Sequence, residues 1–253
     1  MPRYVLRLEY DGAPFVGWQR QAEGLSVQQV VEEAAARLVA GAAVEAAAAG
    51  RTDSGVHASG QVAQIELPRV IDGETLRDAL NFHVKPHPVA ILAAARAPEG
   101  FHVRFSAIGR AYRYRILDRR APPALERGRV WHVPRPLDAE AMHRAAQALV
   151  GRHDFSSFRA AACQASGPVR TLDRLDIGRV GQEIVVETAA RSFLHHQVRN
   201  MVGSLRRVGD GSWTEADIAR VLDAADRRQG GQTAPPEGLT LTEVRYPDGL
   251  CPV

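Results

Sequence analysis

The order of the predicted strands and helices most constrains the fold of this chain. In the first half, hydrophobic alternation and helical spacing predict strand, helix, strand, strand, helix and strand, in that order. The six elements cover residues 4–10, 26–38, 46–49, 61–67, 74–82 and 89–95. This β-α-β-β-α-β order is typical of a ferredoxin-like split βαβ unit.

Ser26 is predicted to open the first helix. The segment SVQQ has the form of a capping box, in which Ser26 caps the helix and Gln29 reaches back. Apolar residues then follow at helical spacing: Val27, Val30, Val31, Ala34 and Leu38.

The second half repeats the mixture of strands and helices. Predicted strands cover residues 110–116, 171–177, 183–188 and 239–246, and predicted helices cover 137–150, 213–222 and a segment that begins near Ser192. Asp138 and Thr214 are expected to cap two helices, and residues 151–158 are expected to form a loop. We therefore expect an α+β protein with two α/β units, residues 1–105 and 106–253.

Composition places the chain among soluble globular proteins, with 45% hydrophobic and 24% charged residues. Cys163 and Cys251 form no CxxC pattern, so neither a zinc site nor a disulfide framework is expected, which fits a reducing cytoplasm. The first residues lack the apolar core of a signal peptide, and no apolar run reaches the length of a membrane span. The prediction is a cytoplasmic protein without membrane association.

Residues 50–58, with the sequence GRTDSGVHA, are predicted to form a loop between two strands. The loop contains turn-forming residues, but it also carries Arg51, Asp53 and His57. A purely structural interpretation is an Asx-turn at Asp53 with Arg51 as its surface ion-pair partner. A functional interpretation is a carboxylate presented to another molecule, since two glycines permit a close approach of the backbone.

Two further segments combine aromatic residues with arginines. Residues 15–21 place Phe15 and Trp18 beside Arg20 in a loop, where the rings either stack on bases or pack under the sheet. Alternation in residues 110–116 puts Tyr112, Tyr114 and Ile116 on one face of a strand and Arg113 and Arg115 on the other.

The segment after Ser192 is predicted to be an amphipathic helix. Its apolar face contains Leu194, Val198, Met201, Leu205 and Val208. His195, Arg199 and Arg206 fall on an adjacent stripe of this helix. Neighbouring helical residues point about 100° apart, so His195 and His196 are not expected to share a metal ion.

The segment GRTDSGVHA resembles GRTDAGVHA, the signature of the tRNA pseudouridine synthase A family, with Ser54 in place of alanine. Other family motifs occur in the family's order: FxGWQxQ at residues 15–21, the tyrosine strand, HDFSSF at 153–158, the arginine helix and the terminal GLxLxxVxY. The arginine helix departs from the pattern at Gln197, where methionine is usual, and we expect an effect on packing rather than on chemistry.

The resemblance implies a cofactor-free and metal-free isomerase that converts uridine to pseudouridine at positions 38, 39 and 40 of the anticodon arm of tRNA. By the same motif matches, Asp53 is the essential aspartate, Arg199 its ion-pair partner and Tyr112 the residue against the extruded uracil. The resemblance also implies two ferredoxin-like (RRM-like) units with sheets joined around a central cleft, and a homodimer. Candidate tRNA contacts are Arg20, Arg51, Arg206, Trp18 and His57.

Two other functions fit parts of the sequence. A non-catalytic RNA-binding protein similar to an RRM needs stacking aromatic residues but no paired aspartate and arginine. A metal-dependent hydrolase would use His57, His153 or His195. Release of tritium from uridine C5 distinguishes the isomerase from the first alternative, and activity in excess chelator distinguishes it from the second.

Overall fold

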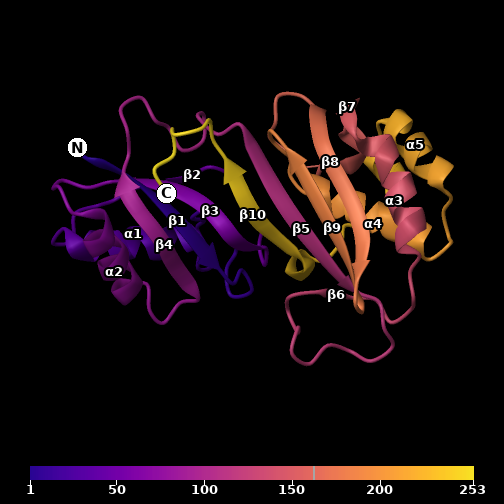
Figure 1. The fold of residues 1–253 in the computed structure, drawn as a ribbon, viewed down its shortest axis with the longest axis horizontal. Coiled ribbons are helices and arrows are strands. Elements are labelled where there is room, and N and C mark those ends of the chain that lie inside the picture. Colours follow the sequence, from indigo (N-terminus) through magenta and orange to yellow (C-terminus); the bar gives the residue numbers. More distant parts are fainter. Residues whose placement is uncertain (162) are drawn as a thin grey trace. The chain divides into compact units, whose positions relative to one another are not determined.

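The computed structural model describes residues 1–161 and 163–253, which form two compact units (Figure 1). The first unit consists of Met1–Gly109 together with Leu241–Val253, and the second of Arg110–Thr240. The end of the chain thus belongs to the first unit. That the units fold as separate domains, divided between residues 105 and 106, stays a prediction.

The first unit contains an antiparallel sheet and two helices. Its strands are β1 (Arg3–Tyr10), β2 (Ala46–Ala48), β3 (His57–Glu66), β4 (Val89–Arg96) and the end of β10 (Leu239–Arg245), and its helices are α1 (Val27–Leu38) and α2 (Gly73–His83). The sheet order is β4-β1-β3-β10, and β2 pairs with β3. β1 is antiparallel to both β3 and β4, and β2 is antiparallel to β3. The six predicted elements of this half are therefore confirmed, in the predicted order.

The start of α1 confirms part of the predicted capping box. The Ser26 side chain accepts a hydrogen bond from the backbone N–H of Gln29 at 3.2 Å. The Gln29 side chain does not reach back, because its Nε2 donates to Glu33 at 2.8 Å. The predicted apolar face is correct for Val27, Val30, Val31 and Ala34, which are buried, whereas Leu38 is only half-buried.

The second unit also combines an antiparallel sheet with helices. Its strands are β5 (Gly109–Leu117), β6 (Trp131–His132), β7 (Gly151–Asp154), β8 (Val169–Val180) and β9 (Glu183–Ala190). The sheet order is β5-β9-β8-β7, with β6 parallel to β5. The helices are α3 (Ala139–Ala146), α4 (Gln197–Gly209) and α5 (Glu215–Ala224), and short 3₁₀ turns cover Gln147–Leu149, Ser156–Phe158, Arg227–Gln229 and Pro236–Gly238. The predicted caps are confirmed: Asp138 accepts from the N–H of Ala141, and Thr214 forms a capping box with Asp217.

Two sequence-based predictions in this unit are wrong. Residues 151–158 are not a loop, because Gly151–Asp154 pair with β8 and Ser156–Phe158 form a 3₁₀ turn. The fourth helix begins at Gln197 rather than near Ser192, because His196 has a left-handed backbone with φ of 61°. His195 therefore precedes the helix and does not share a stripe with Arg199 and Arg206.

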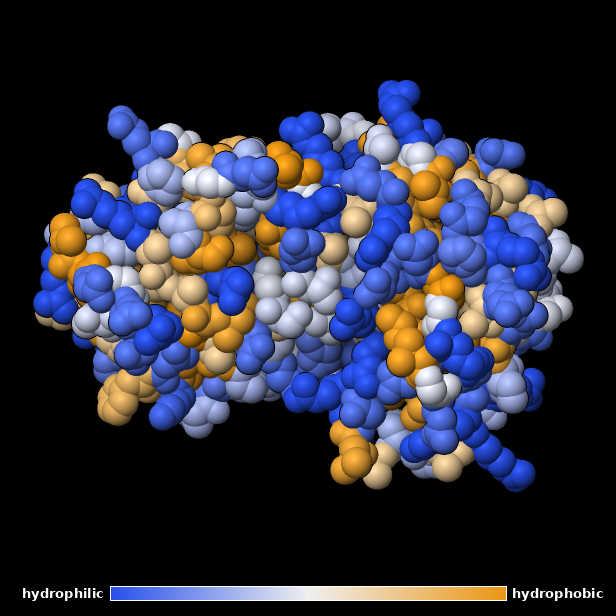
Figure 2. Space-filling view, in the orientation of Figure 1, coloured by the Kyte–Doolittle hydropathy of each residue, from blue (hydrophilic) through white to orange (hydrophobic). Residues whose placement is uncertain are grey.

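The exposed side of the second sheet carries paired charges rather than a basic surface. Glu187 lies 2.9 Å from Arg113 and 3.0 Å from Arg174, and Glu183 lies 2.7 Å from Arg115. In Figure 2, hydrophilic residues cover much of the visible surface over β5, β8 and β9. Among the described residues, none of the helices has the length and apolar character needed to cross a bilayer.

Candidate active site

The loop that carries Asp53 joins β2 to β3, and the segment after β1 holds its backbone in place. The N–H of Trp18 donates to Thr52 O at 3.0 Å, and the N–H of Gly55 donates to Phe15 O at 3.3 Å. Gly17, with φ of +108°, lies directly against this loop: a β-carbon there would come within 2.6 Å of Thr52 O. The requirement for glycine follows from both the backbone angle and this close approach.

A buried polar cluster fastens the start of the loop to the sheet. Gln61 Nε2 donates to Gly50 O at 2.9 Å and to the Tyr10 hydroxyl oxygen at 3.4 Å. The phenol hydrogen of Tyr10 is then available for Thr52 Oγ1, which lies 2.8 Å away. Burial raises the pKa of Tyr10 to about 12, although the hydrogen bonds to Thr52 and Gln61 oppose the rise. Tyr10 is therefore neutral at physiological pH and acts as a hydrogen-bonding support.

Asp53 occupies the turn of this loop and is half-buried. Its carbonyl accepts from the N–H of Val56 at 3.1 Å, and the neighbouring Ser54 hydroxyl donates to Phe15 O at 3.3 Å. Arg51 is exposed, and in the part of the chain that the structure describes it forms no ion pair with Asp53. The surface ion pair of the purely structural interpretation is thus not observed.

Trp18 and His57 are buried, contrary to the expectation that they face RNA. Trp18 is 3% exposed and its ring centroid lies 6.3 Å from that of Tyr10. His57 is 6% exposed, and its Nδ1 accepts from the N–H of Gly12 at 3.0 Å with the Asp11 carboxylate 3.1 Å away. Both side chains pack inside the first unit, and because Phe15 is also buried, the packing alternative holds for Trp18 and Phe15.

Arg20 is exposed but already paired. Its Nε lies 3.3 Å from Glu32 and its Nη2 lies 3.5 Å from Glu33, both on α1. Two carboxylates compensate its charge, which weakens its candidacy as a phosphate contact.

Tyr112 and Tyr114 on β5 have different environments. Tyr114 is fully buried, donates its hydroxyl to Pro235 O at 2.8 Å and has a pKa raised well above its ordinary value, chiefly by burial. Tyr112 is half-buried and meets Phe193 edge to face, with the ring centroids 5.2 Å apart. Tyr114 is therefore part of the core, whereas Tyr112 keeps partial exposure and contacts a neighbouring aromatic residue.

Arg199 lies on α4 and is fastened to the segment that precedes β10. Its Nε donates to Ala234 O at 2.8 Å, and its backbone carbonyl accepts from the N–H of Ala234 at 3.1 Å. Gly203, one turn later, permits this approach, because a β-carbon there would overlap the carbonyl oxygen of Gln232. The guanidinium is therefore positioned by a segment distant in sequence.

Asn200 is a supporting residue that no sequence motif indicated. Its side chain is 1% exposed, donates to Phe158 O at 2.8 Å and accepts from the Thr233 hydroxyl at 2.7 Å. Ser204 connects α4 to the segment that contains Thr233, since it donates to Asn200 O and accepts from the N–H of Gly231 at 2.9 Å each. Hydrophobic spacing gave no signal for this network, because Asn200 lies outside the apolar face that Leu194, Val198, Met201, Leu205 and Val208 form.

The side chains of Arg206 and Gln197 both contact other residues of the second unit. Arg206 pairs with Asp210 at 2.8 Å, one turn later on the same helix. Gln197 is 1% exposed and its Oε1 accepts from the N–H of Leu194 at 2.8 Å, whereas its buried Nε2 has no hydrogen-bond partner in the described structure. The departure from methionine thus adds a hydrogen bond at the turn that leads into α4 and also leaves one buried donor without a partner among the described residues.

The structure divides the predicted catalytic residues between the two units. Asp53 belongs to the first, and Tyr112 and Arg199 belong to the second. His195 and His196 lie before α4 with ring centroids 4.0 Å apart, so the helical argument against a shared metal does not apply. The expected absence of a metal remains a prediction.

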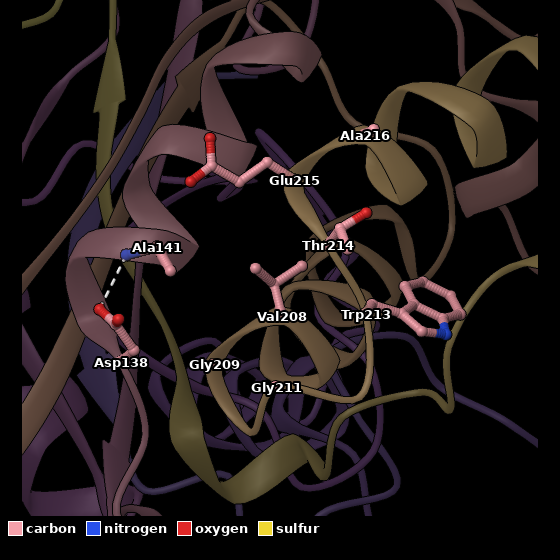
Figure 3. A pocket seen from close by; sticks show the side chains of 9 residues that line it. All are labelled: Asp138, Ala141, Val208, Gly209, Gly211, Trp213, Thr214, Glu215 and Ala216. Carbon is pink, nitrogen blue, oxygen red and sulfur yellow. Dashed lines mark hydrogen bonds between the residues drawn. The ribbon is translucent and has the colours of Figure 1, made fainter.

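A cavity of about 520 Å³ occurs elsewhere in the second unit, among the ends of α3, α4 and α5 (Figure 3). Its carboxylates are engaged locally, since Asp138 Oδ1 accepts from the N–H of Ala141 at 2.9 Å and Glu215 lies 2.6 Å from Arg144. None of the predicted site residues is among the residues that line it.

Comparison with known proteins places these features in a family. Residues 145–247 match the family model described as tRNA pseudouridine synthase. The chain is 62% identical over 247 residues to tRNA pseudouridine synthase A of Acidiphilium cryptum, with 97% of each chain covered. It is 60% identical to the protein of that name from Paramagnetospirillum magneticum and 58% identical to that from Rhodospirillum centenum, with 97% of this chain and 96% and 100% of those chains covered. The chain therefore belongs to the tRNA pseudouridine synthase A family, whose enzymes isomerise uridine to pseudouridine in tRNA.

Proposed function

We propose that this protein isomerises the uridines at positions 38, 39 and 40 of the tRNA anticodon arm, with Asp53 as the catalytic carboxylate. The observation that carries the proposal is the Asp53 loop itself. Three hydrogen bonds fix its backbone, at Gly50, Thr52 and Gly55, and a fourth joins the Thr52 side chain to Tyr10 on β1. A half-buried carboxylate on a fixed loop is preorganised for chemistry rather than for a simple chain reversal.

The isomerisation exchanges one bond to the ribose for another. The bond between C1′ and uracil N1 breaks, the ring rotates, and a bond forms between C1′ and C5. The hydrogen on C5 leaves as a proton, and N1 gains one. Because the target atoms lie inside a stacked stem, the nucleotide must leave the stack to reach the carboxylate. Asp53 then attacks the sugar, attacks the ring or removes a ribose proton.

Arg199 is the proposed ion-pair partner of Asp53. An adjacent guanidinium favours the ionised carboxylate that each of these steps requires. The hydrogen bond from Arg199 Nε to Ala234 supports this role, because it restricts the side chain before substrate binds. Arg51, exposed in the same loop as Asp53, is the competing candidate and otherwise a contact for the RNA backbone.

Tyr112 is the proposed contact for the extruded uracil ring. Its half-buried position and its edge-to-face contact with Phe193 support a stacking role. Its phenol is also able to accept or donate a proton during removal of the C5 hydrogen.

The finer architecture is proposed on the same basis. We propose that each unit is ferredoxin-like, since the antiparallel order β4-β1-β3 with β2 on β3 accompanies the β-α-β-β-α-β sequence in the first unit. A homodimer that acts in the cytoplasm without a cofactor or metal is also proposed, on the family resemblance alone.

The substitution Asp53→Asn tests the proposed function. It removes the charge but keeps the shape, so we expect no tritium release from tRNA labelled at uridine C5. Affinity for the same tRNA is expected to stay within about twofold, because the aspartate faces the reacting atoms rather than the RNA backbone. Ser54→Ala in the same loop is the matched control and should retain activity, since it loses only a 3.3 Å hydrogen bond. A near-normal rate in Asp53→Asn would remove this carboxylate from the chemistry.

The wild-type protein separates the alternative functions in the same assay. A non-catalytic RNA-binding protein would bind the tRNA and release no tritium. A metal-dependent hydrolase would lose its activity in excess chelator, whereas the proposed isomerase would keep it.

A further inference from the structure

A second pocket in the second unit has the charge and shape to hold an anion. It has a volume of about 270 Å³ and lies between the 3₁₀ turns Ser156–Phe158 and Arg227–Gln229. The polar side chains that line it are those of Ser156, Arg159, Asp226 and Arg227. The pocket has room for several water-sized groups of about 30 Å³ each, which is enough for a phosphate group.

Arg227 is half-buried, and its hydrogen-bond partners are neutral. Its Nη2 donates to Asn200 Oδ1 at 3.1 Å and to Thr233 Oγ1 at 3.2 Å. In the described part of the chain, Nε and Nη1 form no hydrogen bond and no carboxylate forms an ion pair with this guanidinium. Burial lowers the pKa of Arg227, which means that the cation has lost solvation without gaining a counter-ion.

Asp226 is the one carboxylate among the described residues that line this pocket, and Arg228, which does not line it, neutralises its charge. Asp226 lies 2.8 Å from Arg228 Nη2, and it accepts from both the Nε and the backbone N–H of Arg228 at 3.0 Å. Arg159 adds a second guanidinium that has no ion-pair partner among the residues described. The pocket therefore carries two uncompensated positive charges, unlike the outer side of the sheet, where Arg113, Arg115 and Arg174 are paired with glutamates.

We propose that Arg159 and Arg227, with Ser156, bind a backbone phosphate of the tRNA substrate. Two planar guanidinium groups and a hydroxyl supply donors that match the geometry of a phosphodiester. This inference rests on the proposed function and adds an anchoring site to it.

The position of Arg227 connects the phosphate to the proposed catalytic residues. Asn200 and Thr233, which hold Arg227, are the sequence neighbours of Arg199 and Ala234, which hold each other. One rigid network thus fixes both guanidinium groups. A phosphate bound at Arg227 would set the position of the RNA backbone relative to Arg199, which is how a shape-reading enzyme selects its target nucleotide.

Salt-dependent binding of unmodified tRNA to the full-length protein tests the site. Each lost phosphate contact should lower the slope of log K against log salt by about 1 between about 50 and 200 mM salt. Arg159→Gln and Arg227→Gln are each expected to weaken binding about tenfold at low salt, and Arg159→Lys should restore most of the slope. Arg144→Gln is the control, since it removes the same charge from an exposed arginine paired with Glu215. If Arg227→Gln fails to fold, the Arg159 variants decide alone, because the side chain of Arg159 has no hydrogen bond to lose within the described residues.

Three outcomes separate this site from the proposed function. In the first outcome, the folded Arg159 and Arg227 variants bind tRNA with the affinity and the salt dependence of the wild-type protein, and the wild-type protein releases tritium normally. This result would overturn the phosphate site and leave the isomerase function intact. Unchanged tRNA binding, together with a loss of thermal stabilisation by inorganic phosphate in these variants, would assign the pocket to free phosphate and also overturn the proposal. No tritium release from the wild-type protein would instead refute the proposed function.

Discussion

Tyr10 shows how one residue of the sheet controls the Asp53 loop. Its hydroxyl joins Thr52 and Gln61, and all three side chains are buried. Tyr10→Phe removes the hydroxyl but leaves both partners in place, so one buried donor and one acceptor lose a partner. We expect a loss of about 1–2 kcal/mol in the free energy of unfolding, measured with urea, and a lower kcat because Thr52 is adjacent to Asp53. Tyr246→Phe, which removes a hydroxyl bonded to Val103 O elsewhere in the first unit, is the control for kcat.

The difference in the free energy of unfolding between the wild-type protein and Tyr10→Phe should depend on pH, because the pKa of Tyr10 is raised in the folded protein. Burial raises the pKa of Tyr10 in the folded protein to about 12, from about 10 in the unfolded chain. Between these values the unfolded state has lost its proton and the folded state has kept it, so stability falls as pH rises. The wild-type advantage over Tyr10→Phe should be constant below about pH 9 and should shrink above about pH 10. A constant difference up to about pH 11 would show that the hydroxyl is solvated.

Arg199 allows its catalytic and structural roles to be separated. Arg199→Ala removes the guanidinium and its hydrogen bond to Ala234, and we expect the rate of tritium release to fall by roughly 100-fold or more, with a smaller loss in tRNA affinity. Arg207→Ala, on the same helix, is the control, because it removes an arginine stacked 4.6 Å over Trp213. Loss of the folded state in Arg199→Ala, seen as a lost urea transition, would reassign Arg199 to structure.

The residue types of the Asp53 loop made the loop predictable, but they did not predict which residues pack against it. Turn-forming residues between two strands identify a loop wherever it lies. Trp18 and His57 are buried because the segment after β1 packs against the Asp53 loop. The hydrogen-bonded residues are far apart in the sequence: Trp18 bonds to Thr52, more than 30 residues away, and Gly12 bonds to His57, 45 residues away. Residue type does not encode such contacts, so aromatic residues expected to face RNA are in fact packed.

Helices and strands with a clear hydrophobic period were predicted well, whereas β7 and the start of α4 were not. The alternation that defines β1 and β5 and the spacing that defines α1 are properties of single segments. β7 is a strand only because β8 pairs with it, and α4 starts late only because His196 adopts a left-handed conformation. Neither cause is visible in hydrophobic pattern.

Gly203 tests how closely α4 must approach the segment before β10. Gly203→Ala would place a methyl group on the carbonyl oxygen of Gln232, a backbone atom that a side-chain rotation cannot move away. We expect a loss of about 3 kcal/mol in the free energy of unfolding and a large fall in activity, since the displaced segment also holds Arg199. Gly178→Ala on β8 is the matched control, because its new methyl group would meet open space and should change stability by less than about 1 kcal/mol. Equal stability in the two variants would show that this contact is adaptable.

At the scale of the whole chain, the two units are not consecutive in sequence. The terminal strand, residues 239–246, was predicted to belong to the second unit, residues 106–253. In the structure, residues 241–253 belong to the first unit, where β10 lies beside β3 and a β-carbon on Gly60 would overlap the carbonyl oxygen of Thr242. Sheet partners are chosen by packing across the fold, and a pattern read along one strand does not specify them.

Deletion of residues 241–253 should therefore unfold the first unit rather than the second. The deleted segment supplies a strand beside β3, and its end packs on the buried cluster around Phe101 and Val103. We expect amide hydrogen exchange in β1 and β3 to rise to the rate of an unfolded chain, because β3 would lose a neighbouring strand and the core cluster that contains Val5 and Val62 would lose its cover. Exchange in β8 and β9 should stay slow, since their ladder is internal to the second unit. Protection of β1 equal to that in the full chain would show that the first unit is complete without its C-terminal strand, and rapid exchange in all four strands would show that the two units unfold together.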